Sequence, residues 1–311
     1  MKLSTIHPAR RSAFTLIELL VVMTILALLV ALLAAGVFKA LNKVADTRNV
    51  RELRDLRTGI VNFQNKYKIG WIPSRIRLRN DLAYDTSLNA SGQPNSPLDY
   101  DSASYLSTVW HNLTAPVTWN PNTTNTDVTL EGDQCLVFFL GGTQGTVGGV
   151  NACVGFSTNS KQPTAVGGDR VEPFFDFQSD RLTTKFDSAG TGYFSYLDAY
   201  GKAPFAYFSS YKKGGGYNRY FATLNASDCS RLAVWPYNDG IKYQNSDTFQ
   251  IISAGRDGVF GQGSNLTVSP APTWTPAKAD SSAALQNGAN AKAGFDDMAD
   301  FYDSMLGVPS N

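Results

Sequence analysis

One carboxylate near the N-terminus is the residue of this chain best suited to a defined chemical role. Glu18 is the fifth residue of a stretch, residues 14–38, whose other 24 residues are uncharged. A helix rises about 1.5 Å per residue, so this stretch is long enough to cross the roughly 30 Å hydrocarbon core of a membrane. A charge inside that core costs on the order of 2–3 kcal/mol. We therefore expect Glu18 to form an ion pair with a cation of a partner.

The residues around Glu18 resemble those of type IV pilin-like proteins. From position 14 the chain reads Phe-Thr-Leu-Ile-Glu, after a leader of residues 1–13 that contains Lys2, Arg10 and Arg11. The resemblance implies that a prepilin peptidase cuts between Ala13 and Phe14 and methylates the new amine of Phe14. Ala13 stands where the family usually has Gly, and because Ala is the nearest residue in size, processing is expected to be retained but slower.

The resemblance also implies how the subunits assemble. The amine of Phe14 on one subunit would pair with Glu18 of a neighbour in a medium of low dielectric constant, where the attraction is strong. A head-to-tail contact that does not close into a ring builds an open helical filament. The basic leader predicts a single-pass protein of the inner membrane with its C-terminal head in the periplasm before assembly. The implied partners are further copies of this chain, minor pseudopilins and the inner-membrane secretion or pilus machinery.

An ordinary signal peptide or signal anchor is the alternative for this segment. A secretory signal has an apolar region of only about 7–15 residues, which is shorter than this one. Neither alternative needs Glu18.

The helix is predicted to continue beyond the membrane segment through residues 39–73. This part has no proline before Pro73, and its apolar residues recur mostly every three or four positions, which is typical of one buried stripe. Gly59 is a weak point, and Gly70 with Pro73 ends the helix. The arginines of this part are interpreted as a solvated helix face. The stripe consists of Val44, Val50, Leu53, Leu56, Ile60, Phe63 and Tyr67.

Residues 74–311 are predicted to form an α+β head, in which the long N-terminal helix packs on a small antiparallel sheet with long loop insertions. This is the pilin fold. Three apolar runs, residues 135–140, 203–209 and 248–253, have strand propensity. Three segments rich in Asn, Thr, Ser, Pro or Gly, residues 89–96, 112–129 and 271–292, are expected to be loops.

The C-terminal region, residues 249–301, resembles the major pseudopilin of type II secretion systems. An apolar run leads into Gly255-Arg256-Asp257-Gly258, and an acidic pair follows at Asp296 and Asp297. The resemblance implies a Ca²⁺ site with Asp257 and Asp297 as ligands, helped by Asp296 and by carbonyls near Ser253 and Gly255. Calcium takes 6–8 oxygen ligands, which such residues supply. A simple β-turn with an acidic helix cap is the alternative.

The three cysteines, Cys135, Cys153 and Cys229, lie in the part expected to face an oxidising compartment. A disulfide between Cys135 and Cys153 would close a short loop over a glycine-rich turn. Three buried thiols are the alternative, because spacing alone does not establish a pairing.

Ten aromatic residues crowd into residues 193–220. Such a density is typical of core packing and cross-strand pairs, with a face for carbohydrate or exported protein as the alternative.

Composition argues against an enzyme and against nucleic-acid binding. The chain has 311 residues, a formal net charge of +1 and two histidines, His7 and His111, so neither a multi-histidine metal site nor a basic footprint is present. The function predicted is a structural subunit of a pilus-like filament, foremost a pseudopilin of type II secretion. A surface type IV pilin for adhesion or motility is the first alternative, and a monomeric membrane-anchored binding module is the second.

Overall fold

The computed structural model describes residues 15–212, 216–221, 226–239, 241–261 and 293–307. By its internal contacts the chain divides into two units, Met1–Thr47 and Arg48–Asn311, and the division falls inside the first helix. We describe each unit by itself and call the second one the head.

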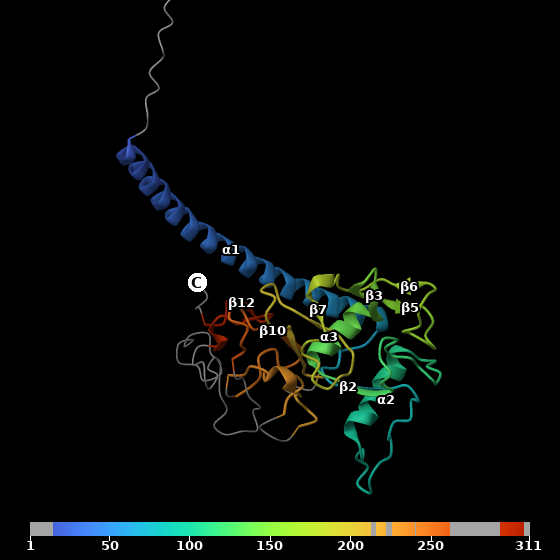
Figure 1. Ribbon diagram of the computed structural model, residues 1–311. Helices are drawn as coiled ribbons and strands as arrows, with labels where there is room; N and C mark the ends of the chain where they lie inside the picture. The colour runs from blue at the N-terminus through green and yellow to red at the C-terminus, as the bar shows by residue number, and fades with distance from the viewer. Residues whose placement is uncertain (1–14, 213–215, 222–225, 240, 262–292, 308–311) are drawn as a thin grey trace, which may run out of the picture. The chain divides into compact units, whose positions relative to one another are not determined.

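Helix α1, Leu16–Tyr67, is the longest element and is drawn in blue in Figure 1. Its window Leu16–Leu33 has a mean hydropathy of 3.0 and buries none of its residues, so by length and composition it could span a membrane. The helix ends where Lys68 turns to a positive φ of 56°, two residues before Gly70. The prediction of one long helix is therefore confirmed, although it ends at Tyr67, before the predicted bound at residue 73.

The apolar stripe of α1 is buried only in the head. Val44 is 65 % exposed, so its predicted place in the buried stripe is wrong. The buried part of the predicted stripe therefore begins at Val50, which is partly buried, as is Tyr67. Four members of the stripe are at most 2 % exposed: Leu53, Leu56, Ile60 and Phe63.

The arginines on the same part of α1 each contact an acidic group. Arg48 pairs with Glu52 on α1 itself, and Arg51 pairs with Asp55. The other two reach residues near the C-terminus: Arg54 pairs with Asp303 and Arg57 with Asp300. This face is thus neutralised within the head.

The head contains one four-stranded antiparallel sheet, whose order is β12-β11-β10-β9. Its central strand β10, Phe249–Ser253, pairs with β9, Ala206–Ser209, and on its other side with β11, Met298–Ala299. Strand β12, Tyr302–Met305, pairs with β11. The predicted strands at residues 203–209 and 248–253 are confirmed.

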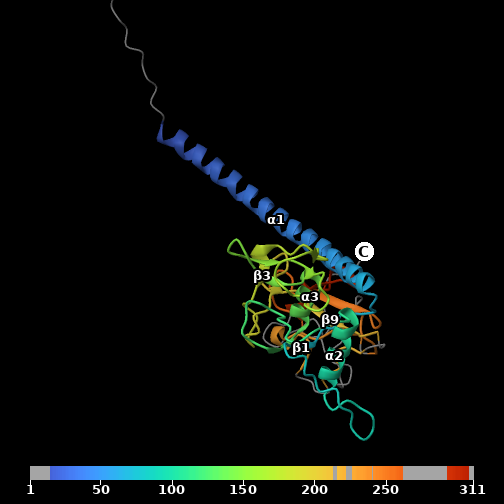
Figure 2. The ribbon, with the colours of Figure 1, turned by 90° about the vertical axis from the view of Figure 1, so that its right-hand side faces the viewer.

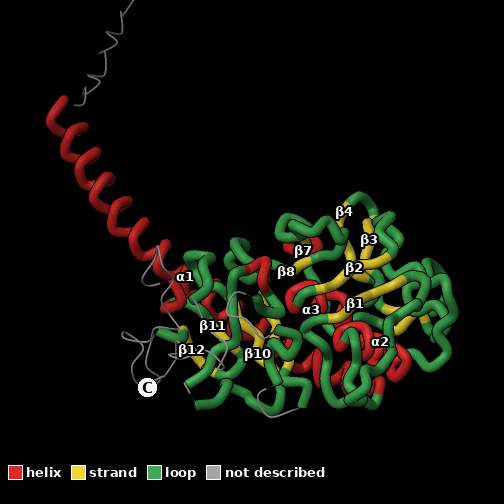
Figure 3. The backbone as a smooth tube through the Cα atoms, turned by 90° about the horizontal axis from the view of Figure 1, so that it is seen from below, coloured by secondary structure: helices red, strands yellow, loops and turns green. Residues whose placement is uncertain are grey.

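Two-stranded ribbons and loops make up much of the rest, as Figure 3 shows. The pairs are β1–β2, β3–β4, β5–β6 and β7–β8, all antiparallel. Their bounds are Ile76–Arg79 and Asp127–Leu130, Gln144–Val147 and Val150–Cys153, Phe156–Ser157 and Arg170–Val171, Leu182–Thr183 and Ser195–Tyr196. The head also contains helix α2, Pro97–Val109, and the short 3-10 turns Ser179–Arg181, Ser230–Leu232 and Ala293–Phe295.

Residues 135–140, predicted as a strand, belong instead to helix α3, Gly132–Gly141. All ten residues of α3 are buried, and the helix packs against β8 and β9. Figure 2 shows α3 beside β9. A helix that is covered on every side is apolar all round, so its sequence has no helical period to detect. Gly142 ends it with a φ of 78°.

The aromatic residues of the predicted cluster are core residues. Eight of the ten are at most 6 % exposed, and Tyr200 and Tyr220 are partly buried. The eight are Tyr193, Phe194, Tyr196, Phe205, Tyr207, Phe208, Tyr211 and Tyr217. They do not form an exposed binding face.

Candidate functional site

The N-terminal end of α1 holds Glu18 in a defined position. Thr15 precedes the helix, and its backbone N–H and its hydroxyl each donate a hydrogen bond of 2.9 Å to Glu18 Oε2. The backbone N–H of Glu18 in turn lies 3.3 Å from Thr15 Oγ1. This reciprocal arrangement is a capping box, which satisfies N–H groups that a helix start leaves unpaired.

The capping box directs the carboxylate of Glu18 back toward the start of the helix. Negative charge is favoured there, because the helix dipole is positive at this end. The predicted cleavage site, Ala13 and Phe14, lies outside the described residues. The ion pair between the Phe14 amine of one subunit and Glu18 of a neighbour stays a prediction.

Residues 8–34 match the family model described as the prokaryotic N-terminal methylation motif. The N-terminus is a prepilin-type motif. Together with the apolar window of α1, it supports a membrane-anchored, type IV pilin-like protein that is processed by a prepilin peptidase and assembles into pilus-like filaments. The motif indicates a structural subunit rather than an enzyme. No curated protein and no solved structure matches the chain.

The second candidate site of this prepilin-type protein is the loop after β10. The backbone N–H of Asp257 donates a 2.9 Å hydrogen bond to Asp296 Oδ2. Gly255 has a φ of 68°, and a Cβ there would lie 2.2 Å from the carbonyl oxygen of Asp296. Only glycine fits so close an approach. The structure therefore brings the acidic pair back against the loop.

Asp297 lies behind this contact and is fully buried. Its Oδ2 accepts hydrogen bonds from the Tyr237 hydroxyl at 2.6 Å and from the Gly261 N–H at 2.9 Å. Its Oδ1 has no hydrogen-bond partner in the described part of the chain. Burial raises the pKa of Asp297 well above its usual range, and the negative charges of Asp296 and Asp257 raise it further.

Ser253 faces a different polar cluster. Its hydroxyl accepts a 2.8 Å hydrogen bond from Asn49 Nδ2 and donates one of 2.7 Å to Asp198 Oδ2. Asp198 is fully buried, and burial raises its pKa to about 6. The hydroxyl of Ser253 is therefore already engaged by Asn49 and Asp198. Among the described residues, no three His, Cys, Asp or Glu side chains are grouped so that they could hold a metal ion.

The predicted disulfide between Cys135 and Cys153 is wrong, because all three cysteines are free thiols. Cys153 lies against Gly141 at the C-terminal end of α3, where a Cβ would come within 2.7 Å of its Sγ. Cys135 lies six residues earlier, about 9 Å away along the helix axis. A disulfide needs Cα atoms about 4.4–6.8 Å apart, so the helix keeps the two thiols separate.

One functional relationship was missed at the level of sequence. Thr15 and Glu18 have the Thr-x-x-Glu spacing of a capping box, and this spacing would have revealed it. No local sequence pattern indicates the hydrogen-bond partners of Asp297, because Tyr237 is 60 residues away in the chain.

Proposed function

We propose that this chain is the subunit of a helical filament of the type II secretion kind, polymerising through α1. The observation that carries the proposal is Glu18, held at the start of an exposed apolar helix within the prepilin-type motif. In a bundle of such helices the carboxylate of Glu18 would neutralise the amine of Phe14 on a neighbour. That pair would fix the axial register of each added subunit.

The loop after β10 favours a secretion filament over a surface pilus, because a surface pilin does not require this loop. Contact between Asp257 and Asp296 and the close approach at Gly255 support this part of the proposal.

Calcium at this loop is a further part of the proposal. The unpaired, buried Oδ1 of Asp297, close to two other carboxylates, fits a hard cation. Asp257 and Asp297 would bind the ion, helped by Asp296 and by carbonyls near Ser253 and Gly255, and their side chains would have to close around it, because the described residues hold no preformed group of three such ligands. When bound, calcium would neutralise carboxylates that otherwise repel one another. Two of these side chains also contact the loop without calcium: Asp297 accepts hydrogen bonds from Tyr237 and Gly261, and Asp296 accepts one from the Asp257 N–H.

The filament proposal is tested by electron cryomicroscopy of material sheared from cells that produce the native chain or Glu18→Ala. Intact-mass analysis of the subunit accompanies it. We expect filaments of a chain that begins at N-methylated Phe14, and their loss in Glu18→Ala. Asp303→Ala is the matched control, because Asp303 is an acidic residue whose side chain is 92 % exposed in the head. It should assemble as the native chain does.

Three results would contradict the proposal. Normal filaments from Glu18→Ala would show that the carboxylate does not set the register. Unprocessed native chain without filaments would favour the membrane-anchored binding module. Filaments on the cell surface that persist when the secretion machinery is deleted would favour the surface pilus.

A further inference from the structure

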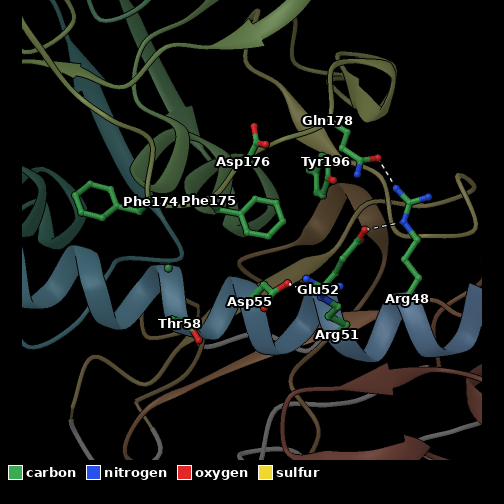
Figure 4. A pocket seen from close by; sticks show the side chains of 11 residues that line it. Arg48, Arg51, Glu52, Asp55, Thr58, Phe174, Phe175, Asp176, Gln178 and Tyr196 are labelled. Atoms are coloured by element: carbon green, nitrogen blue, oxygen red, sulfur yellow. Dashed lines mark hydrogen bonds and ion pairs between the residues drawn. The ribbon is translucent and has the colours of Figure 1, made fainter.

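A cleft of about 560 Å³ opens in the head between α1 and residues 174–178 (Figure 4). This volume lies in the range of small-molecule sites. All of its lining belongs to the unit that begins at Arg48. The side chains of the lining come from Arg48, Arg51, Glu52, Asp55, Thr58, Phe174, Phe175, Asp176, Gln178 and Tyr196.

One side of the cleft is aromatic and rigid. Phe175 is half-buried and meets Tyr196 edge to face, with ring centroids 5.7 Å apart. Gly59 lets this segment approach α1, because a Cβ there would lie 2.9 Å from the carbonyl oxygen of Phe174. The cleft therefore has a fixed apolar surface beside the helix.

The polar side is organised by buried charges. Glu52 accepts two hydrogen bonds of 2.6 Å from Arg181 and one of 3.0 Å from Arg48 Nε. Arg48 also donates to the side-chain oxygen of Gln178, as Figure 4 shows. These planar groups are held before any ligand arrives, so little side-chain entropy is lost on binding.

Several polar groups at the cleft are available to a ligand. Asp176 is exposed and makes no hydrogen bond or ion pair with any residue that the structure describes. The side-chain nitrogen of Gln178 likewise has no partner in the described residues. Arg51 and Asp55 are exposed and are only 3.5 Å apart in a pair open to solvent, which a ligand can replace at small cost.

The charges of the cleft balance. Two guanidinium groups in the lining and that of Arg181 behind it face the carboxylates of Glu52, Asp55 and Asp176. A strongly anionic or cationic ligand would therefore gain little from the site as a whole. A neutral ligand with many hydroxyl groups fits it better, because hydroxyl pairs bind planar carboxylate, amide and guanidinium groups. The C–H face of a sugar ring would rest on Phe175.

We propose that this cleft binds a neutral oligosaccharide. The two walls define the orientation of the sugar: its apolar face on Phe175 and its hydroxyl groups on Asp176, Gln178 and Arg51. The site goes beyond the filament function and does not depend on it.

The test uses the full chain in a zwitterionic detergent, since detergents with sugar head groups would compete. The probes are neutral di- to tetrasaccharides of glucose, galactose, mannose and N-acetylglucosamine, with tetralysine and a sialylated trisaccharide as charged probes. Saturation-transfer NMR identifies binders, and isothermal titration measures their Kd. We expect at least one neutral saccharide to bind, and neither charged probe to bind more tightly.

Variants assign the binding to the cleft. Asp176→Ala should weaken binding about tenfold, as the loss of one hydrogen bond to a charged group does. Gln178→Ala is the second variant, and circular dichroism verifies that both fold. Asp180→Ala is the matched control, because Asp180 is exposed and nearby but does not line the cleft. It should bind as the native chain does.

The proposal is overturned by any of three results. These are no binding of any neutral saccharide, equal binding by the native chain and both folded cleft variants, and tighter binding of tetralysine or the sialylated trisaccharide than of every neutral probe.

Discussion

Arg181 and Glu52 are joined by two parallel hydrogen bonds of 2.6 Å, although 129 residues separate them in the chain. Both side chains are about nine-tenths buried, at 8 % and 10 % exposure. Arg181 also lies over the ring of Tyr196, with its guanidinium carbon 4.4 Å from the centroid. This pair fastens the segment that precedes β7 to helix α1.

Removing one partner of this pair should destabilise the head strongly. Arg181→Met leaves Glu52 buried with Arg48 as its one cationic partner in the described part of the chain, and we expect a loss of about 3–5 kcal/mol in the free energy of unfolding. Urea unfolding followed by circular dichroism measures it. Arg51→Met is the control, because the Arg51–Asp55 pair is exposed and 3.5 Å long, and it should change stability by less than about 1 kcal/mol. Equal effects of the two substitutions would show that burial does not decide the strength of these pairs.

Gly59→Ala should destabilise the head even though alanine favours a helix. The gain in helix propensity is about 1 kcal/mol. The new Cβ would lie 2.9 Å from the Phe174 carbonyl oxygen, a backbone atom, and 3.4 Å from Leu140 Cδ1, so the segment must shift. Such overpacking costs about 1–3 kcal/mol, which gives a net loss of about 1 kcal/mol. Asn62→Ala at an exposed position of α1 is the control and should be neutral or slightly stabilising. A more stable Gly59→Ala variant would contradict the close approach.

The stability of the head should fall as the pH rises through about 6, partly because of Asp198. Burial raises the pKa of this carboxyl to about 6 in the folded state, above its value of about 3.9 when unfolded. The folded state thus binds the proton more tightly. This contribution is full below about pH 4 and is lost as the pH rises through 6, with a change of about 1 kcal/mol between pH 5 and 7.

Asp198→Asn should remove this part of the pH dependence. The measurement is the difference in unfolding free energy between the native chain and the variant at pH 5 and at pH 7. This difference cancels the contributions that other titrating groups make in both proteins. One such group is Asp300, whose pKa burial raises to about 7. Asp180→Asn at an exposed position should give a constant difference. The same constant difference for Asp198→Asn would contradict the shifted pKa.

Calcium should stabilise the head if the loop after β10 binds it. For a Kd on the order of 0.1–1 mM, calcium at about 10 mM should raise the free energy of unfolding by about 1–3 kcal/mol. Asp257→Asn, at an exposed position, should abolish most of this gain, whereas the control Asp303→Asn should keep it. Thermal unfolding with calcium, with magnesium and with a chelator measures it. A native chain that calcium does not stabilise would contradict the calcium part of the proposed function.

The three thiols should remain unpaired and slow to react. Cys135 and Cys229 are fully buried, and burial raises the pKa of Cys153 to about 12, so few thiolates form near neutral pH. We expect an unchanged melting temperature with a reducing agent, and labelling by iodoacetamide only after unfolding. An intact mass lower by two hydrogens would reveal a disulfide and contradict the structure.

The parts of the fold that depend on local pattern could be predicted from the sequence. The stripe from Val50 to Tyr67 repeats with the helical period, and β9 and β10 combine β-branched and aromatic residues with nearby turn residues. Glu18 could be singled out because it is the only charged residue in the apolar run of residues 14–38. These features depend on residues that are close together in the chain, so one sequence is enough to detect them.

The parts that failed depend on distant packing. Residues 135–140 are apolar on all sides because α3 is enclosed on all sides, and a short run of this kind fits a buried strand equally well. The predicted disulfide between Cys135 and Cys153 failed for a related reason, because a helix and a strand place Cys135 at different distances from Cys153. The cleft was missed because Glu52 and Arg181 meet only after folding.

The order of the four-stranded sheet has a consequence for the synthesis of this protein. Strand β10 ends at Ser253, and the strand that covers its outer edge begins at Met298, 45 positions later. A chain shortened after Ser253 would carry a completed β9–β10 pair with its hydrogen-bonding edge open, and such an edge recruits other strands. Incomplete copies are therefore expected to aggregate, and only chains that reach β11 and β12 would leave the ribosome with that edge closed.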